Sequence, residues 1–205
     1  MAAIEREMIY EINRLRSNPS SYLEYITPLL NDARERLKNE GPGFKNYSLT
    51  FTGRPGENQT VDTTWHYVNT EEVQALATLA DTLRHLKPLG ILKPDKGIYM
   101  AATKYAEDEQ AHKWGLMHVG SNGSWPWDRI TLYSPGMSFG NENIAAQSGT
   151  PAARDIVLQL LIDSGIPGYG HRYNMLDPQW THIACRQEFY NGSAWWIEDF
   201  GKEKK

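Results

Sequence analysis

The sequence contains a single cysteine, Cys185, among its 205 residues. One thiol cannot form an internal disulfide, which excludes the small cysteine-rich folds that depend on such bridges. No apolar run approaches the roughly 20 residues that a membrane-spanning helix needs, so we expect no transmembrane segment. The net charge of −4 offers no basic surplus for binding nucleic acid or an anionic membrane. Residues 1–6 lack the hydrophobic stretch of a signal peptide.

The remaining composition is that of an ordinary globular protein. Hydrophobic residues make up 40% of the chain and charged residues 22%. A chain of this length can fill one hydrophobic core, and nothing in it demands a second. We therefore expect one domain over residues 1–205.

Hydrophobic residues at helical spacing predict several helices. Ile4, Met8, Ile12 and Leu15 predict an amphipathic helix at the N-terminus. Asn18-Pro19 fits an N-cap followed by proline, so a second helix is expected to begin there. Further helices are expected from Thr70 to about Leu86, from Asp95 to Gly115, and from Thr150-Pro151 to Gly165.

Two regions have the pattern of β-structure. Residues 39–69 combine glycine and proline breakers with β-prone runs, which predicts a hairpin or loop insertion around 39–69. Near the C-terminus, Asn191-Gly192 separates the aromatic-rich runs 182–190 and 193–200, a strong signal for a hairpin. Helices around an antiparallel sheet predict the α+β class.

Three short boxes combine a histidine or a carboxylate with glycines and turn-forming residues. They lie at 116–123, with a His-x-x-x-x-Gly segment, at 140–145, with Gly-Asn-Glu-Asn-Ile-Ala, and at 170–176, with Gly-His-Arg-Tyr-Asn-Met-Leu. Such residues favour a bent backbone. We therefore expect the side chains of the three boxes to converge.

Together the boxes resemble those of the CAP family, the group of SCP, PR-1 and antigen 5 proteins, in a microbial-type branch. The run Leu160–Pro167 before the third box adds to this likeness, which covers roughly residues 70–201. The resemblance implies a three-layer α-β-α sandwich with a central antiparallel sheet. It also implies an extracellular or cell-envelope protein of bacterial type, whose signal peptide is absent from this sequence.

The resemblance further implies a cleft lined by two histidines and two acids. Carried over residue by residue, these are His118, Glu142, His171 and Asp163, the last an aspartate where the family often has glutamate. A separate argument supports Asp163: it follows an apolar run at the end of a helix, where an acid is unfavourable unless a cation compensates for it. The alternative is a solvated acid at a helix end.

Two carboxylates and two neutral imidazoles carry a charge of −2, which suits a divalent metal ion. Zinc fits the mixed nitrogen and oxygen donors best, with magnesium or calcium behind it. None of the standard zinc-site spacings occurs in the sequence. The alternative is that His118 and His171 only hydrogen-bond Glu142 and Asp163 and tie the boxes together.

Two functions follow from these residues. The first is an extracytoplasmic binding module whose cleft holds a metal ion and a small lipid, glycan or peptide ligand. The second is a metal-dependent hydrolase of peptidase type, with Glu142 as general base, His118 and His171 as ligands, and Asp163 as a ligand or orienting acid. A purely structural role is a third. The sequence indicates neither the natural ligand nor the oligomeric state.

Several other residues suggest weaker hypotheses. Ser138 lies in a Gly-x-Ser-x-Gly match, but the strand and helix of a nucleophile elbow are not predicted around it. Trp125 and Trp127 are placed in a loop where they can contact a ligand, whereas Trp195 and Trp196 are expected to alternate, with one directed inward. An architectural role is expected for Gly170, Arg172, Asn174 and Asn143. No binding role is expected for the remaining histidines, which are His66, His85, His112 and His182.

Overall fold

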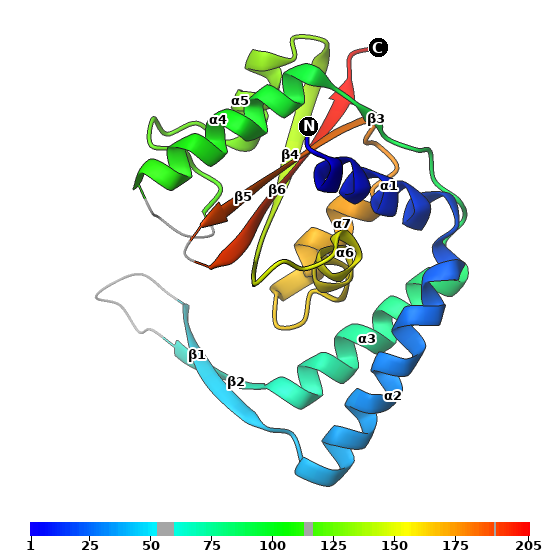
Figure 1. Ribbon diagram of the computed structural model, residues 1–205. Helices are drawn as coiled ribbons and strands as arrows, with labels where there is room; N and C mark the ends of the chain where they lie inside the picture. The colour runs from blue at the N-terminus through cyan, green and yellow to red at the C-terminus, as the bar shows by residue number, and fades with distance from the viewer. Residues whose placement is uncertain (53–59, 113–116, 191) are drawn as a thin grey trace.

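The computed structural model spans residues 1–205 and describes all of them except 53–59, 113–116 and 191 (Figure 1). Side chains are described outside residues 47–63, 113–116 and 191. The helices of the described part are α1 (Ala3–Ser17), η1 (Pro19–Tyr22), α2 (Leu23–Glu40), α3 (Val68–His85), α4 (Lys96–His112), α5 (Pro126–Tyr133), α6 (Ala153–Ile162), η2 (Pro167–Tyr169) and α7 (Gly170–Leu176). The strands are β1 (Phe44–Thr52), β2 (Thr60–Tyr67), β3 (Lys93–Pro94), β4 (Met137–Ser148), β5 (His182–Tyr190) and β6 (Ser193–Glu203).

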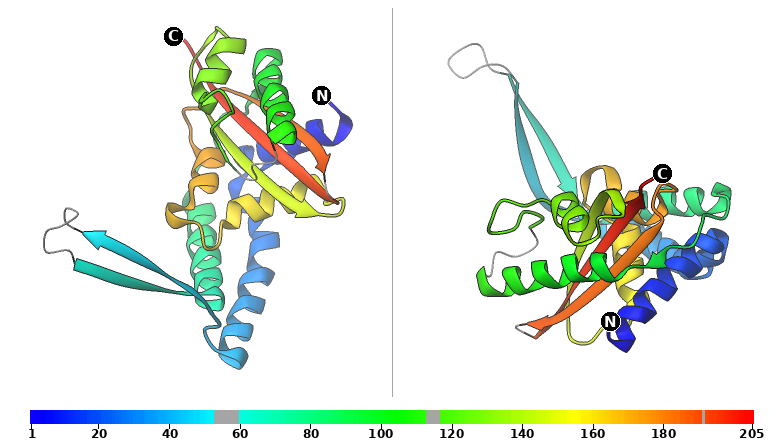
Figure 2. Two further views of the ribbon diagram at one scale, coloured as in Figure 1. Left: turned by 90° about the vertical axis from the view of Figure 1, so that its left-hand side faces the viewer. Right: turned by 90° about the horizontal axis from the view of Figure 1, so that it is seen from above.

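A four-stranded sheet of order β3-β5-β6-β4 forms the centre of the molecule. Strands β4, β5 and β6 are antiparallel, whereas the two-residue β3 pairs parallel with β5. Helices α4 and α5 lie on one face of this sheet, and α1, α6 and α7 lie on the other (Figure 1, Figure 2). The α-β-α sandwich is confirmed, and its sheet is mixed rather than purely antiparallel.

The hydrophobic core follows these layers, because β5 and β6 are covered on both faces. Trp196 and Phe200 of β6 pack with α1, α3 and α6, while Ile197 packs with Ala102 and Tyr105 of α4. Trp196 is fully buried and Trp195 only partly so, which confirms the expected alternation. Even and odd residues of β6 therefore face opposite layers.

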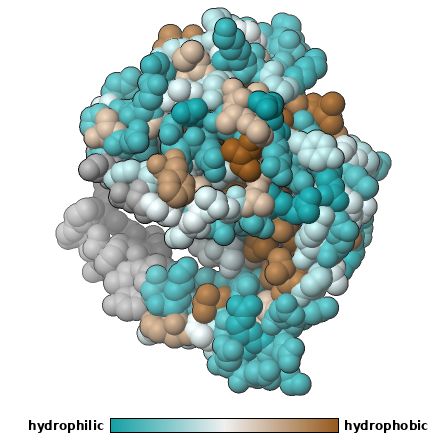
Figure 3. Space-filling model, in the orientation of Figure 1, coloured by the Kyte–Doolittle hydropathy of each residue, from teal (hydrophilic) through white to brown (hydrophobic). Residues whose placement is uncertain are grey.

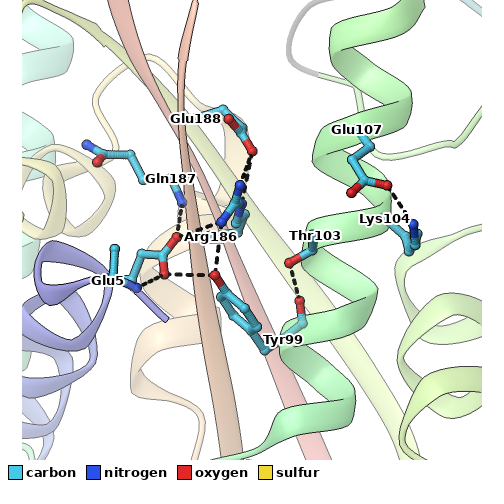
Figure 4. A network of polar contacts seen from close by, with 9 residues as sticks. Glu5, Tyr99, Thr103, Lys104, Glu107, Arg186, Gln187 and Glu188 are labelled. Atoms are coloured by element: carbon cyan, nitrogen blue, oxygen red, sulfur yellow. Dashed lines mark hydrogen bonds and ion pairs between the residues drawn. The ribbon is translucent and has the colours of Figure 1, made fainter.

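A network of polar contacts around the buried Glu5 side chain ties the N-terminal helix to the sheet (Figure 4). The Glu5 carboxylate of α1 accepts hydrogen bonds from the Gln187 amide of β5 at 3.1 Å and from the Tyr99 hydroxyl of α4 at 3.0 Å. Arg186 of β5 lies 3.4 Å from Glu5 and donates to the Tyr99 hydroxyl. Residues from three elements thus fix α1 beside the edge of the sheet.

Helices α2 and α3 pack against each other beside the sandwich, and the β1–β2 hairpin projects from their far end (Figure 2). The hairpin occupies the range in which a hairpin or loop insertion is predicted, with Phe44 paired to Tyr67 at its base. Among the described helices, none combines the length and the hydropathy that crossing a membrane requires.

Several predicted boundaries are wrong by a few residues. Helix α3 begins at Val68 rather than Thr70, and α6 begins at Ala153, where the Asp155 carboxylate accepts a hydrogen bond from the Ala152 amide, rather than at Thr150-Pro151. Asn18 makes no side-chain capping bond, and a 3-10 turn precedes α2. The Asp95 cap is confirmed by its bond to the Ile98 amide at 2.8 Å. The predicted helix end at Gly115 and the turn residue Asn191 lie outside the described residues.

Candidate functional site

The second and third boxes adopt regular structure instead of the expected bent backbone, whereas residues 117–123 of the first box form bends and a turn as expected. Glu142 lies in the middle of β4, and His171 lies in the first turn of α7. The asparagines do not form turns here, because their side chains make hydrogen bonds between β4 and α7. Asn174 donates to the Glu142 carbonyl at 3.3 Å and to Asn143 Oδ1 at 2.8 Å. Asn141 Nδ2 in turn donates to Asn174 Oδ1 at 2.9 Å. These amides hold α7 against β4.

His118 pairs with Glu142 on the α4–α5 side of the sheet. The imidazole Nδ1 lies 2.9 Å from Glu142 Oε1, and the Glu142 side chain is completely buried. The His118 side chain is 41% exposed, so its second nitrogen is on the accessible side of the pair. Burial and the Arg129 charge both lower the pKa of His118, which favours the neutral ring.

Arg129 of α5 holds the other oxygen of this carboxylate. Its guanidinium donates to Glu142 Oε2 at 2.9 Å and to the carbonyls of His118 at 3.1 Å and Ser124 at 2.8 Å. It also lies over the Tyr105 ring, 3.9 Å from the centroid. One residue therefore fixes the acid and the loop that carries the histidine.

Asp199 lies opposite Glu142 in the β4–β6 register and is fully buried. Burial raises the pKa of Glu142 to about 7, with Arg129 opposing the rise. Burial and the neighbouring Glu142 charge raise the pKa of Asp199 well above its ordinary value. The ionised form of either acid disfavours ionisation of the other, so the two titrate as a pair. Because Arg129 adds a positive charge, the net charge around the histidine–acid pairs is less negative than the −2 expected from the sequence.

His171 pairs with Asp163 on the opposite side of the sheet. Helix α6 ends at Ile162, and Asp163 follows in the left-handed conformation with φ of 56°. Its Oδ1 lies 2.7 Å from His171 Nδ1, and its Oδ2 accepts from the His171 amide at 3.0 Å. The predicted stop at Gly165 is wrong, because Asp163 itself ends the helix and points its carboxylate at the first turn of α7, where a negative charge is favourable.

Both histidine–acid pairs are joined to β4, one through Glu142 and the other through the next residue, Asn143. Glu142 faces the α4–α5 layer, while Asn143 faces the other layer and donates to the His171 carbonyl at 3.2 Å. Alternation along the strand thus brings the two histidine–acid pairs to adjacent positions on its two faces. The four predicted residues form two pairs. Within the part of the chain that the structure describes, no three side chains of His, Cys, Asp or Glu are grouped as a metal site would require.

Glu198 is a further buried acid, on the His171 side of β6. Its Oε2 accepts from Asn143 Nδ2 at 3.2 Å, and the residue has no exposed surface. Burial raises its pKa to about 7, opposed by the Asn143 hydrogen bond and by His171. The sequence carried a signal for both acids: Glu198-Asp199 interrupts an apolar strand, where charged residues must be buried on one face or the other.

Replacing Glu198 with glutamine should flatten the dependence of stability on pH. The folded pKa of about 7 exceeds the ordinary value of 4.5, so the folded state binds more protons between these pH values and loses stability as the pH rises. A shift of this size corresponds to roughly 3 kcal/mol. Urea unfolding at pH 5 and pH 8 should show a smaller loss in Glu198→Gln than in the wild type, and equal losses would refute the assignment.

The residues expected to be architectural, and the histidines expected to have no role in binding, have the following places in the structure. Arg172 is architectural as expected, since its guanidinium donates to the carbonyls of Leu161, Ile162 and Ala75. Gly170 has a right-handed backbone that does not require glycine, and the left-handed residues before His171 are Gly168 and Tyr169. Each remaining histidine has another partner, which is Glu71 for His66, Asp81 for His85, Asp108 for His112 and Thr181 for His182.

Ser138 lies within the extended strand β4, and its hydroxyl donates to the Lys202 carbonyl at 3.1 Å. This confirms that no nucleophile elbow is formed, because such a serine needs a sharp turn between a strand and a helix. Trp125 and Trp127 belong to the start of α5 rather than to a loop, with Pro126 at the first helical position. Their rings stack 5.1 Å apart, and Trp127 stacks on Phe139 of β4.

Comparisons with known proteins found similarity only among solved structures. No protein-family model and no curated protein matches the sequence. Among solved structures, the chain is similar to an outer surface protein from Borrelia burgdorferi, with 19% identity and a TM-score of 0.47 over 65% of this chain and 90% of that one.

The chain is also similar to an extracellular protein containing a SCP domain from Bacillus anthracis, with 23% identity and a TM-score of 0.44 over 66% of this chain. It spans only 41% of that protein's length. Neither likeness carries a function to this chain.

Proposed function

We propose that this chain is an extracytoplasmic binding module with a CAP-like fold, in which His118 and His171 reach around the edge strand β4 from its two faces and present Nε2 to one divalent metal ion beside a small lipid, glycan or peptide ligand. The observation that carries the proposal is that a carboxylate occupies Nδ1 of each ring. Metal-binding histidines have this arrangement, because an acid at one nitrogen fixes the ring and makes the other more basic.

The donor set favours zinc over magnesium or calcium, since two imidazole nitrogens suit a borderline metal better than a hard one. The acids fit a supporting role. Both oxygens of Glu142 accept hydrogen bonds, from His118 and Arg129, and both oxygens of Asp163 accept from His171. Two protein nitrogens leave the other metal positions to water or ligand.

A hydrolase with Glu142 as the direct general base is less well supported. The Glu142 side chain has no exposed surface and lies beneath His118 and Arg129. A general base must come within hydrogen-bond reach of the proton it removes. Glu142 can therefore influence a bound molecule only through the His118 ring, which favours the binding module.

Isothermal titration with zinc chloride tests the proposal. We expect saturable binding to the wild type and a loss of at least about tenfold in affinity for His118→Asn and His171→Asn. Asp163→Asn, which alters only the group behind the ring, should weaken binding by about 10- to 100-fold.

The matched control is His85→Asn, because His85 is an exposed histidine with a nearby aspartate on α3. This variant should bind zinc as the wild type does. Absence of binding heat in the wild type, or equal heat in His171→Asn, would contradict the proposal.

A further inference from the structure

A hollow of about 270 Å³ lies between α4, α5 and the loop residues that precede α5. Lys104 and Asp108 line it from α4, residues 128–133 line it from α5, and residues 121–124 form the third side. It adjoins the His118 loop, because Arg129 lines the hollow and donates to the His118 carbonyl. Sites for drug-sized ligands measure roughly 300–1,000 Å³, so this one suits a smaller molecule.

Oxygen atoms of three lining residues converge at one point of the hollow. A Cβ added to Gly120 would lie 2.9 Å from Ser124 Oγ and 3.2 Å from both Asn122 Oδ1 and Asp108 Oδ2. The missing side chain of Gly120 therefore leaves room for this group of acceptors. Such a group suits a ligand that brings several hydrogen-bond donors.

The oxygens are held in place by the loop itself. Asp108 Oδ2 accepts from the Ser121 amide at 2.7 Å, and Asn122 Oδ1 accepts from the Ser124 amide at 3.0 Å. The Gly120 amide closes the loop by donating to the Ser124 carbonyl at 2.9 Å. Polar groups that are ordered before binding lose less entropy when the ligand arrives.

The hollow has no net charge among the described residues that line it. The positive charges of Lys104 and Arg129 balance the negative charges of Asp108 and Asp128. Each cation is also paired with a carboxylate that does not line the hollow, at 2.7 Å for Lys104 and 2.9 Å for Arg129. A phosphate or a fatty acid would have to compete for these cations. The charges therefore favour a neutral ligand.

Helix α5 adds apolar surface to this polar site. Leu132 is 70% exposed and Tyr133 is 38% exposed, and both line the hollow. A sugar ring combines C–H groups on its faces with hydroxyl groups around its rim, so it can contact apolar side chains and oxygen acceptors together. Figure 3 shows a mainly hydrophilic surface over α4, which is unfavourable for a lipid chain.

We propose that this hollow binds one neutral sugar unit of a glycan. Its hydroxyl groups donate to the oxygens gathered near Gly120, and one C–H face contacts Tyr133 and Leu132. The choice of a glycan over a lipid or a peptide rests on the binding module proposed above, but it does not require the metal ion. A peptide matches the wall less well, since each peptide unit brings an acceptor with its donor.

The test is a titration of the ¹⁵N-labelled full chain in EDTA with methyl glycosides of glucose, galactose, mannose and N-acetylglucosamine, in both anomers. At least one should give saturable shift changes confined to residues 104–108, 120–124 and 128–133. Gly120→Ala places a methyl group among the three oxygens and should weaken binding by about tenfold or more. Tyr133→Ala, a milder change at an exposed side chain, should weaken it by about fivefold.

Each variant has a matched control. Gly90→Ala adds a methyl group where nothing lies within 4 Å, and Tyr10→Ala removes a 65% exposed tyrosine on α1. Both should bind the sugar as the wild type does.

Several outcomes would overturn the proposal. They are the absence of saturable shifts with every glycoside, shifts confined to other residues, and equal affinity in Gly120→Ala and the wild type. Tighter binding of methyl β-glucuronide or of acetyl-glycyl-glycine amide than of any neutral glycoside would assign the hollow to an anion or a peptide instead. Because EDTA is present, a failure here is separate from a failure of the zinc titration.

Discussion

Replacing Arg129 with methionine is expected to lower the free energy of unfolding by about 3–5 kcal/mol at pH 8, since this leaves a buried carboxylate without its partner. The Arg129 side chain is 7% exposed, and Glu142 is completely buried. Removing the guanidinium also frees the carbonyls of His118 and Ser124. Urea unfolding followed by tryptophan fluorescence measures the loss.

Two variants isolate the cause. Arg36→Met removes a surface pair with Glu72, in which the arginine is 42% exposed, and should change stability by less than about 1 kcal/mol. The double variant Arg129→Met, Glu142→Gln should regain part of the loss, because the unpaired charge is gone. The loss in Arg129→Met should also shrink at pH 5, where Glu142 takes up a proton. An Arg129→Met variant as stable as Arg36→Met would contradict this account.

Replacing Arg172 with methionine should have a similarly large effect, about 3–5 kcal/mol. The guanidinium satisfies the carbonyls of Ala75, Leu161 and Ile162, and each buried group left unpaired costs about 1–3 kcal/mol. It also supports the Tyr169 ring. The loss should be visible in urea unfolding at any pH from 6 to 8, because no carboxylate partner is involved.

Arg172→Lys provides the matched comparison. Lysine keeps the charge but cannot reproduce the fork of donors that reaches carbonyls on both α3 and α6. This variant should recover less than half of the lost stability. Full recovery by lysine would show that charge, rather than the set of hydrogen bonds, is what the position requires.

The sequence predicted most helices and the C-terminal strands because their signals are local. Ile4, Met8, Ile12 and Leu15 define one face of α1, and a hairpin brings the runs around Asn191-Gly192 together as expected. Boundaries failed where a local preference was overridden. Thr150-Pro151 has the form of a helix start, yet the cap forms at Ala152 with Asp155.

The histidines and acids of the site could be named from the boxes, whereas their arrangement could not. Glu142 and Asn143 are neighbours in sequence but face opposite layers, which only the strand assignment reveals. Asparagine and glycine around them favour turns locally, and the amide network with Asn174 overrides that preference.

Arg129, Glu198 and Asp199 were missed for a different reason. Arg129 lies eleven residues after His118 in a helix of eight residues that the sequence pattern did not reveal. The two acids occupy a strand whose burial on both faces depends on α4 and on α6 from distant parts of the chain. Their shared burial is a property of the assembled layers, and the local pattern shows only that two acids interrupt an apolar strand.

The most direct test of the central claim is the protonation state of His118 and His171, read from long-range ¹H–¹⁵N correlation spectra of ¹⁵N-histidine-labelled protein at pH 8. If the Glu142 and Asp163 carboxylates hold Nδ1, both rings carry their proton on Nδ1 and leave Nε2 bare. Signals from Nε2–H tautomers at these residues would show that the accessible nitrogens are occupied by protons, and the account would fail.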